Sequence, residues 1–245
     1  MTTATDETLA PPELSADLRD YLGRISRPES PELVALRERT AAMPFVSVME
    51  GSPQVGRLLQ FLIRLTGARN VLELGVFTGC STLAMATALP PGGTVVAMDV
   101  SERWAAIGRE FWARSGCDSR IDLRIGPADA ALEALLAEGR AGTFDLAFVD
   151  ANKDGYGSYF ERCLALLRSN GVMVFDNILF AGRVHPAYTD ARIRAEEPGR
   201  PKSLQDCYIS YAAGLRRFND TIAADDRVDL VVLPMLDGVT LARKV

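Results

Sequence analysis

Apolar residues recur along this chain with two different spacings, one typical of helices and one typical of buried strands. Residues 14–25, 31–43 and 53–66 carry apolar side chains three and four positions apart, which predicts three helices near the N-terminus. The segment 27–31 holds two prolines and separates the first two helices. The first part of the chain is therefore predicted to be helical.

After residue 70 the pattern changes to short apolar runs that alternate with segments of helical spacing. The runs predict strands at 71–74, 94–98, 121–125, 144–149 and 172–175. The segments between and after them predict helices near 80–89, 102–115, 128–137 and 156–167. Five such alternations with short connections predict an α/β fold, a parallel sheet covered by helices on both faces.

The C-terminal part departs from this alternation. Residues 181–206 are rich in arginine, proline, glycine and acids and are expected to form a long excursion, a feature that is often functional. A helix at 207–223 follows. Strands at 228–233 and 239–242, joined by an Asp-Gly turn, predict a hairpin that closes the sheet with an antiparallel strand.

The domain organisation follows from these segments. Residues 1–12 are polar and end in two prolines, which predicts a disordered tail. Residues 13–245 are then expected to form a single domain, with 13–66 as its N-terminal helices and 181–206 as an insert on the substrate side. We find no internal repeat.

Composition narrows the class of protein. Of 245 residues, 48% are hydrophobic and 24% charged, as in ordinary soluble globular proteins. No apolar run reaches the roughly 18 residues that a membrane helix needs, and the polar N-terminus lacks the apolar core of a secretory signal. We therefore expect a cytoplasmic protein without a membrane partner. The net charge of −5 argues against a nucleic-acid partner.

Histidine and cysteine usage excludes several kinds of site. His185 is the single histidine, so histidine-based triads and multi-histidine metal sites are excluded by count. The four cysteines form no C-x-x-C pair, which argues against a zinc site or a disulfide framework. A general base would have to be a carboxylate, a lysine, a tyrosine or His185.

The stretch 71–81, VLELGVFTGCS, is the most informative in the chain. A strand, a glycine turn and a helix start follow one another, the layout that brings backbone close to a nucleotide-like ligand. The spacing E-x-G-x-x-x-G places Glu73 where a pyrophosphate-binding turn has a glycine, and a carboxylate there would repel phosphate. It suits a cationic, hydroxyl-rich cofactor, and S-adenosylmethionine is the leading candidate.

Acids at the ends of two further strands extend this cofactor site. Asp99 follows the second strand, where an acid can accept hydrogen bonds from ribose hydroxyls; a simple turn acid is the alternative. Ala128 and Asp129 follow the third strand, where an adenine edge would lie. A helix N-cap is an equally good interpretation of Asp129.

A second group of polar side chains follows the fourth and fifth strands. Asp150, Asp176 and Asn177 offer the hard oxygen ligands that Mg²⁺ or a similar divalent ion prefers. Lys153 follows Asp150 closely, so its amine can return to the same pocket and act as a base. Three turn residues and a solvated lysine are the alternative interpretation.

At this point the chain resembles a known family, the cation-dependent O-methyltransferases related to catechol and caffeoyl-CoA O-methyltransferases. The likeness runs from about residue 48 to the C-terminus, with the motifs in order. The stretches that carry it are VLELGVFTGCSTLAMA (71–86), VVAMDVS (95–101), FDLAFVDANKDGY (144–156), GVMVFDN (171–177) and DGVTLAR (237–243). The resemblance implies a Rossmann-like class I methyltransferase fold with a seven-stranded, mostly parallel sheet.

The resemblance also implies roles for individual residues. Asp150, Asp176 and Asn177 would ligate Mg²⁺, or another divalent ion such as Mn²⁺ or Ca²⁺, and Lys153 would take the proton from the substrate hydroxyl. The residues implied in binding S-adenosylmethionine are Val48, Met49, Glu73, Gly75, Gly79, Ser81, Asp99, Ala128, Asp129 and Asp150. Cys80 stands where relatives often carry a tyrosine, and Asn152 where they often carry an aspartate.

These inferences predict methyl transfer from S-adenosylmethionine to one hydroxyl of a small catechol-type substrate, because only adjacent oxygens chelate the ion. A coenzyme A thioester of the caffeoyl type is the alternative acceptor, kept open by Arg183, Arg192 and Arg194 in the insert. An NAD-linked dehydrogenase and a non-catalytic cofactor-binding protein are alternatives of other classes. Relatives are often dimers, so we expect a homodimer.

Overall fold

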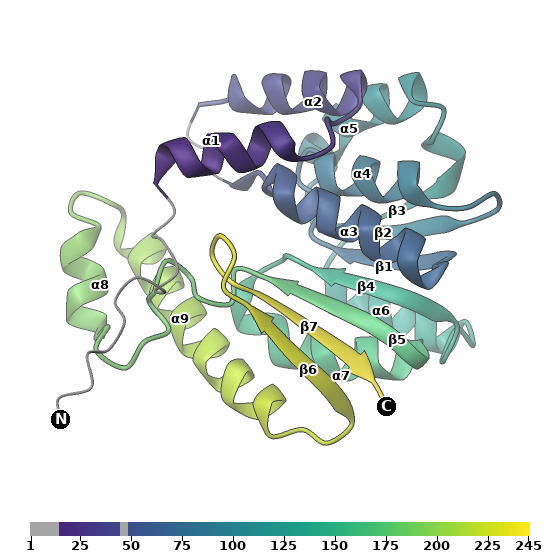
Figure 1. Ribbon diagram of the computed structural model, residues 1–245. Helices are drawn as coiled ribbons and strands as arrows, with labels where there is room; N and C mark the ends of the chain where they lie inside the picture. Colours follow the sequence, from purple (N-terminus) through teal and green to yellow (C-terminus); the bar gives the residue numbers. More distant parts are fainter. Residues whose placement is uncertain (1–14, 45–48) are drawn as a thin grey trace, which may run out of the picture.

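The computed structural model of the chain describes residues 15–44 and 49–245 (Figure 1). The tail expected at 1–12 and the expected cofactor contact Val48 lie outside these residues. No helix in the described part is long and apolar enough to cross a membrane.

A seven-stranded sheet forms the centre of the molecule (Figure 1). Its order is β3-β2-β1-β4-β5-β7-β6, with β1 to β5 parallel and β7 antiparallel to both of its neighbours. The strands are β1 (Asn70–Leu74), β2 (Thr94–Asp99), β3 (Ile121–Ile125), β4 (Phe144–Val149), β5 (Leu167–Asp176), β6 (Val228–Leu233) and β7 (Val239–Lys244). This sheet confirms the predicted fold class.

Helices cover both faces of the sheet. On one face lie α2 (Pro31–Ala41), α3 (Pro53–Thr66), α4 (Cys80–Ala88) and α5 (Glu102–Arg114); on the other lie α6 (Ala128–Ala137), α7 (Tyr156–Leu166) and α9 (Lys202–Ala223). The remaining helical segments are α1 (Ala16–Ile25), α8 (Asp190–Glu196) and the short 3₁₀ turns η3 (Asp118–Arg120) and η4 (Lys153–Gly155).

The core is split by the sheet because successive strand residues point to opposite faces. In β1, Val71 packs in the cluster with α3 and α4, whereas Leu72 packs in the cluster with α6, α7 and α9. Both are fully buried. The continuous apolar runs of the sequence therefore reflect strands that are covered on two sides.

The N-terminal helices begin at serines, as the sequence favours. The side chains of Ser15, Ser30 and Ser52 each accept a hydrogen bond from the first turn of the helix that follows. The helix α3 ends at Gly67, whose φ of +66° suits glycine.

The predicted excursion at 181–206 was partly wrong, because α8 lies within it and α9 begins at Lys202 rather than 207. Local contacts make α8 a helix: the Thr189 side chain caps it, Ile193 is buried, and Arg192 pairs with Glu196 at 3.1 Å. The arginine-rich and glycine-rich composition concealed these contacts.

The strand β5 begins at Leu167, five residues earlier than predicted, and α7 ends at Leu166. Its pairing with β4 shifts register between Phe144 and Leu146, and Asn170 has a φ of +62°. An irregularity of this kind interrupts the apolar pattern, so the pattern predicts only the part of the strand that starts at residue 172.

Candidate functional site

The predicted site residues that follow β1, β2, β4 and β5 lie along one edge of the sheet. The carboxyl end of β1 lies between those of β2 and β4, and β4 lies beside β5. The turn after β1 is tied to both neighbours, since the Gly75 amide donates to Met98 O at 2.9 Å and the Asp150 amide donates to Leu74 O at 2.8 Å. The edge is therefore continuous from the glycine turn to Asp176.

The glycines of the turn are required by close packing. Gly75 has a φ of +92°, and a Cβ there would lie 2.1 Å from the carbonyl oxygen of Asp150. Gly79 has a φ of +85°, and its Cβ would lie 2.4 Å from the Trp112 ring. Both positions exclude larger residues, which brings the turn against the start of the Asp150 loop.

Asp99 holds the glycine turn in shape. Its Oδ2 accepts hydrogen bonds from the amides of Val76 and Phe77, at 2.9 and 2.8 Å, and its Oδ1 accepts one from Ser101 at 2.8 Å. The turn-acid interpretation is thus observed. A carboxylate has lone pairs beyond these three bonds, so the ribose role stays a prediction.

Glu73 is fully buried and bridges β1 to α4. Its two carboxyl oxygens accept hydrogen bonds from Ser81 at 2.5 Å and Thr82 at 2.6 Å. Burial raises the pKa of Glu73 to about 8, and these two hydrogen bonds oppose the shift. Ser81, the other predicted residue here, is therefore placed directly on Glu73.

The predicted adenine residues lie at the start of α6. Ala128 is its first residue and Pro127 precedes it as N-cap, so Asp129 is not the cap residue. The Asp129 carboxylate instead accepts a hydrogen bond from Ser158 at 2.6 Å and pairs with Arg162 at 3.2 Å.

Met49, the other predicted cofactor contact near the N-terminus, is 56% exposed.

Lys153 is buried beside Asp150. Its Nζ donates to Asp150 Oδ1 and, at 2.8 Å, to the hydroxyl of Tyr156. That hydroxyl lies 2.9 Å from the carbonyl oxygen of Asp176 and 3.1 Å from that of Val149. Burial first, and then the charges of Asp150 and Asp176, raise the pKa of Tyr156 well above its ordinary value, so it remains a hydroxyl donor.

Asp176 and Asn177 complete the group at the end of β5. Asp176 is 3% exposed, and burial together with the negative charge of Asp150 raises its pKa to about 7. Its Oδ1 accepts a hydrogen bond from the Asn177 amide at 2.8 Å. Asn177 has a φ of +56°, a conformation that asparagine tolerates better than most residues.

The donor set fits a hard divalent ion. Two carboxylates that repel each other, with an amide oxygen next in the chain, would be stabilised by a cation with oxygen preference. Within the described residues no group of three or more His, Cys, Asp or Glu side chains is arranged to hold a metal. A site here would therefore depend on the amide oxygen of Asn177.

Sequence reasoning missed two residues of this edge. Tyr156 was read only as the start of a helix, although a tyrosine three residues after a buried lysine is placed to contact it. Asp237 was read only as a turn residue, yet its carboxylate accepts a hydrogen bond from the Ala181 amide at 2.7 Å. This bond joins segments far apart in the sequence, so no local signal reveals it.

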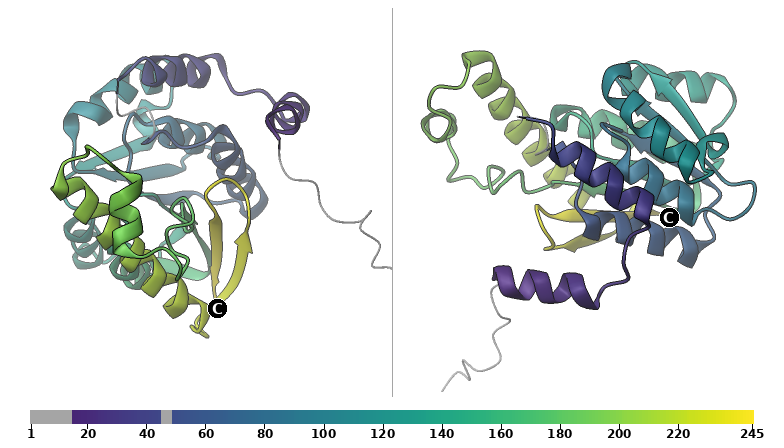
Figure 2. Two further views of the ribbon diagram at one scale, coloured as in Figure 1. Left: turned by 90° about the vertical axis from the view of Figure 1, so that its left-hand side faces the viewer. Right: turned by 90° about the horizontal axis from the view of Figure 1, so that it is seen from above.

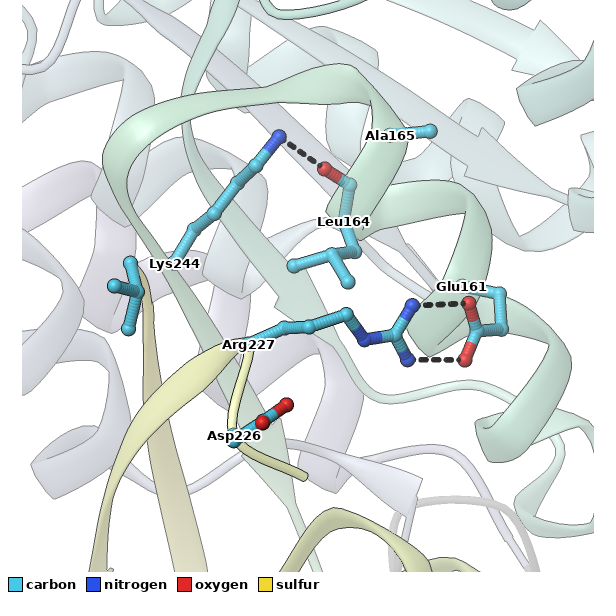
Figure 3. A pocket seen from close by; sticks show the side chains of 7 residues that line it. Glu161, Leu164, Ala165, Asp226, Arg227 and Lys244 are labelled. Carbon is cyan, nitrogen blue, oxygen red and sulfur yellow. Dashed lines mark hydrogen bonds and ion pairs between the residues drawn. The ribbon is translucent and has the colours of Figure 1, made fainter.

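The two basic residues that line a hollow at the opposite edge of the sheet, Arg227 and Lys244, already have partners (Figure 3). Arg227 pairs with Glu161 at 2.7 Å and with Asp225 at 2.6 Å, and Lys244 Nζ donates to the carbonyl oxygens of Leu164 and Leu167. We assign no ligand to this hollow.

Comparisons with known proteins agree with the geometry. The profile of a family described as O-methyltransferase matches residues 24–245. The chain is 45% identical over 197 residues to tricin synthase 2 of Oryza sativa subsp. japonica; that match covers 80% of this chain and only 63% of the relative. It is 41% identical over 234 residues to caffeoyl-CoA O-methyltransferase 2 of Zea mays, covering 94% of this chain and 84% of that protein.

A solved structure gives the same assignment. The crystal structure of the O-methyltransferase from Bacillus cereus in complex with SAH superposes with a TM-score of 0.76 at 30% identity, covering 94% of this chain and 97% of that one. The family predicted from the order of the motifs is thus confirmed. The chain is a member of the S-adenosylmethionine-dependent O-methyltransferase family that contains the caffeoyl-CoA and catechol types.

Proposed function

We propose that this protein transfers the methyl group of S-adenosylmethionine to one of two adjacent hydroxyls of a small aromatic substrate, in a reaction that depends on a divalent ion. The observation that carries the proposal is the group at the end of β4 and β5. There the buried Lys153 lies against Asp150, while Asp176 and Asn177 follow the neighbouring strand.

The donor would bind at the glycine turn. Gly75 brings the backbone close, and Asp99 keeps the turn in shape. A bound ammonium group would favour the ionised form of Glu73, which burial alone disfavours. The other residues that we assign to the donor are Val48, Met49, Gly79, Ser81, Ala128, Asp129 and Asp150.

The acceptor would bind at Asp150, Asp176 and Asn177, which we assign as ligands of Mg²⁺ or a similar ion. When bound, the ion supplies positive charge that favours the deprotonated hydroxyl and fixes its orientation. Lys153 Nζ would accept the proton of the substrate hydroxyl. Tyr156 holds that nitrogen in place through its hydroxyl, which is itself anchored to backbone carbonyls.

A free aromatic diol is favoured over a coenzyme A thioester. A thioester would need free cations for its phosphates, and three arginines of the insert were the candidates. Arg183 pairs with Glu197 at 2.6 Å, Arg194 with Asp206 at 2.6 Å, and Arg192 with Glu196 while lying over the Tyr188 ring. Their charges are already compensated within the chain.

A methylation assay tests the proposal. The purified protein is incubated with S-adenosylmethionine and catechol, its meta isomer resorcinol, or caffeoyl-CoA, with Mg²⁺ or with EDTA. We expect methylated product from catechol with Mg²⁺ and none from resorcinol. Equal turnover of catechol and resorcinol in EDTA would contradict the proposal, and strong preference for caffeoyl-CoA would replace the acceptor.

We also propose a homodimer. Helix α1 carries an apolar stripe, contains no buried residue among those described, and stands apart from the body in both views of Figure 2. Ile25 on α1 is 61% exposed and Leu65 on α3 is 67% exposed. Apolar surface of this kind is typical of subunit contacts. Sedimentation equilibrium would show a dimer, and a monomer at micromolar concentration would contradict it.

A further inference from the structure

The segment after β5 has an unusual backbone. We call residues 177–184 the strap. Three of its non-glycine residues have left-handed φ values: +56° at Asn177, +47° at Phe180 and +52° at Ala181. Each such residue costs on the order of 1–3 kcal/mol and persists only where the surroundings hold it. The strap begins with the proposed metal ligand Asn177, so what holds it matters for the site.

The β6–β7 hairpin holds the strap from one side. The Leu179 amide donates to Asp237 O at 2.9 Å, and the Ile178 amide donates to Gly238 O at 3.2 Å. The Asp237 side chain adds a third bond, from the Ala181 amide to Oδ1 at 2.7 Å. Because β7 pairs with β5 at Asp176 and Val239, the hairpin turn lies directly beside the strap.

Helix α9 holds the strap from the other side. Asn219 Nδ2 donates to Ile178 O at 3.0 Å, and Arg216 Nε donates to Val184 O at 2.9 Å. These bonds fix carbonyl groups near the two ends of the strap. The strained residues Phe180 and Ala181 lie between them, and there the Asp237 carboxylate makes its contact.

We propose that Asp237 is a positioning residue for the metal site. By accepting a hydrogen bond from the Ala181 amide, its carboxylate holds Phe180 and Ala181 in the left-handed conformation and thereby fixes the strap that begins with Asn177. The role requires an acceptor oxygen at the right distance and does not require negative charge. This inference rests on the proposed divalent-ion site and names a residue that supports it.

Three substitutions separate position from charge. D237N keeps an acceptor oxygen at the same place without the charge, D237E keeps the charge but displaces the acceptor, and D237A removes both. Binding of Mn²⁺ to the protein loaded with S-adenosylhomocysteine is measured by electron paramagnetic resonance. As a matched control, D226A removes an exposed acid at the far end of the same hairpin, beside the hollow of Figure 3.

We expect Mn²⁺ affinity to fall about tenfold or more in D237A, the usual cost of losing a group that orients a metal ligand. D237N should stay within about threefold of the unsubstituted protein, because the hydrogen bond remains. D237E should fall between them, D226A should match the unsubstituted protein, and affinity for S-adenosylhomocysteine should be unchanged throughout.

If D237A fails to fold, the comparison of Mn²⁺ affinity between D237N and D237E still shows whether Asp237 acts through its position or its charge. Tighter Mn²⁺ binding by D237E than by D237N would show that charge matters and would overturn the inference, as would unchanged binding in a folded D237A. Absence of Mn²⁺ binding by the unsubstituted protein would instead overturn the proposed function. The two failures are therefore distinguishable.

Discussion

The proposed cofactor end and the proposed acceptor end of the site are built in different ways. At the cofactor end, the turn after β1 is fixed by its own glycines and by Asp99 on the adjacent strand, which binds the amides of Val76 and Phe77. At the acceptor end, the strap after β5 is fixed by groups from α9 and the β6–β7 hairpin, about 30 to 60 residues later in the chain.

The two ends of the site are therefore held rigid by different interactions. The cofactor end excludes any side chain at Gly75 and Gly79, so its shape is set by backbone packing. The acceptor end depends on individual hydrogen bonds and on the burial of charged groups. Substitutions at the first should therefore act on folding, whereas substitutions at the second should act on turnover.

The largest effect is expected at the acceptor end, for Asp176→Ala. The variant loses one of the three proposed metal oxygens, and we expect kcat with catechol and Mg²⁺ to fall by about 10³-fold. Affinity for S-adenosylhomocysteine, measured by titration calorimetry, should be nearly unchanged. Full turnover in this variant would show that Asp176 is no ligand.

Lys153→Met should lower kcat by about 10²-fold or more, the usual contribution of a positioned general base. The KM for S-adenosylmethionine should stay the same, since Lys153 lies at the acceptor end. Steady-state kinetics with both substrates varied gives the comparison. Lys202→Met, at the start of α9, is the control; a KM effect in place of a kcat effect would move Lys153 to the cofactor end.

At the cofactor end, Gly75→Ala should destabilise the fold by at least about 2 kcal/mol, because the added Cβ meets the Asp150 carbonyl and φ is left-handed. Gly116→Ala is the matched control: Gly116 has a φ of +66° with open space around it, so its cost should be about 1 kcal/mol. Urea unfolding measures both, and equal values would contradict the close approach.

Tyr156→Phe should lower kcat by about tenfold, because Lys153 loses an acceptor while the buried ring stays. Tyr159→Phe is the control, since its hydroxyl donates to Asn152 and does not contact Lys153. The ratio of the two kcat values measures how much the hydrogen bond between Tyr156 and Lys153 contributes to turnover. Equal losses in the two variants would mean that Tyr156 acts only through packing.

The last prediction concerns the pH dependence of stability. Burial raises the pKa of Glu73 from 4.5 to about 8, so the folded protein binds a proton that the unfolded chain releases between these values. The free energy of unfolding should therefore fall as pH rises from 4.5 to 8, by up to about 1.4 kcal/mol per pH unit from this group. Urea unfolding of Glu73→Gln should show a shallower slope over that range.

At the proposed cofactor end the sequence predicted the strand, the turn and the helix well, because their signals are local. A buried apolar run that contains Glu73 is followed by Gly75 and Gly79, and this order predicts a strand, a turn and the start of a helix within eleven residues. The five predicted parallel strands are all present. Periodicity also located the closing hairpin.

The acceptor end was predicted less completely. Asp150, Asp176 and Asn177 follow strands, so the sequence names them as candidates, but Asp237 contacts the strap only once β7 pairs beside β5. The contact between Tyr156 and Lys153 could be predicted only if the burial of Lys153 were already known. Contacts that depend on strand order leave no periodic pattern in the sequence.

The helix α8 was missed for another reason, because the composition of residues 181–206 is typical of a loop.

A crystal structure with Mg²⁺, S-adenosylhomocysteine and catechol would show directly whether a divalent ion binds at the ends of β4 and β5. We expect one ion bound by oxygens of Asp150, Asp176 and Asn177 at about 2.0–2.1 Å, with both hydroxyls of catechol on the ion and Lys153 Nζ beside one of them. An ion held elsewhere, or these three side chains turned away from one another, would contradict this expectation.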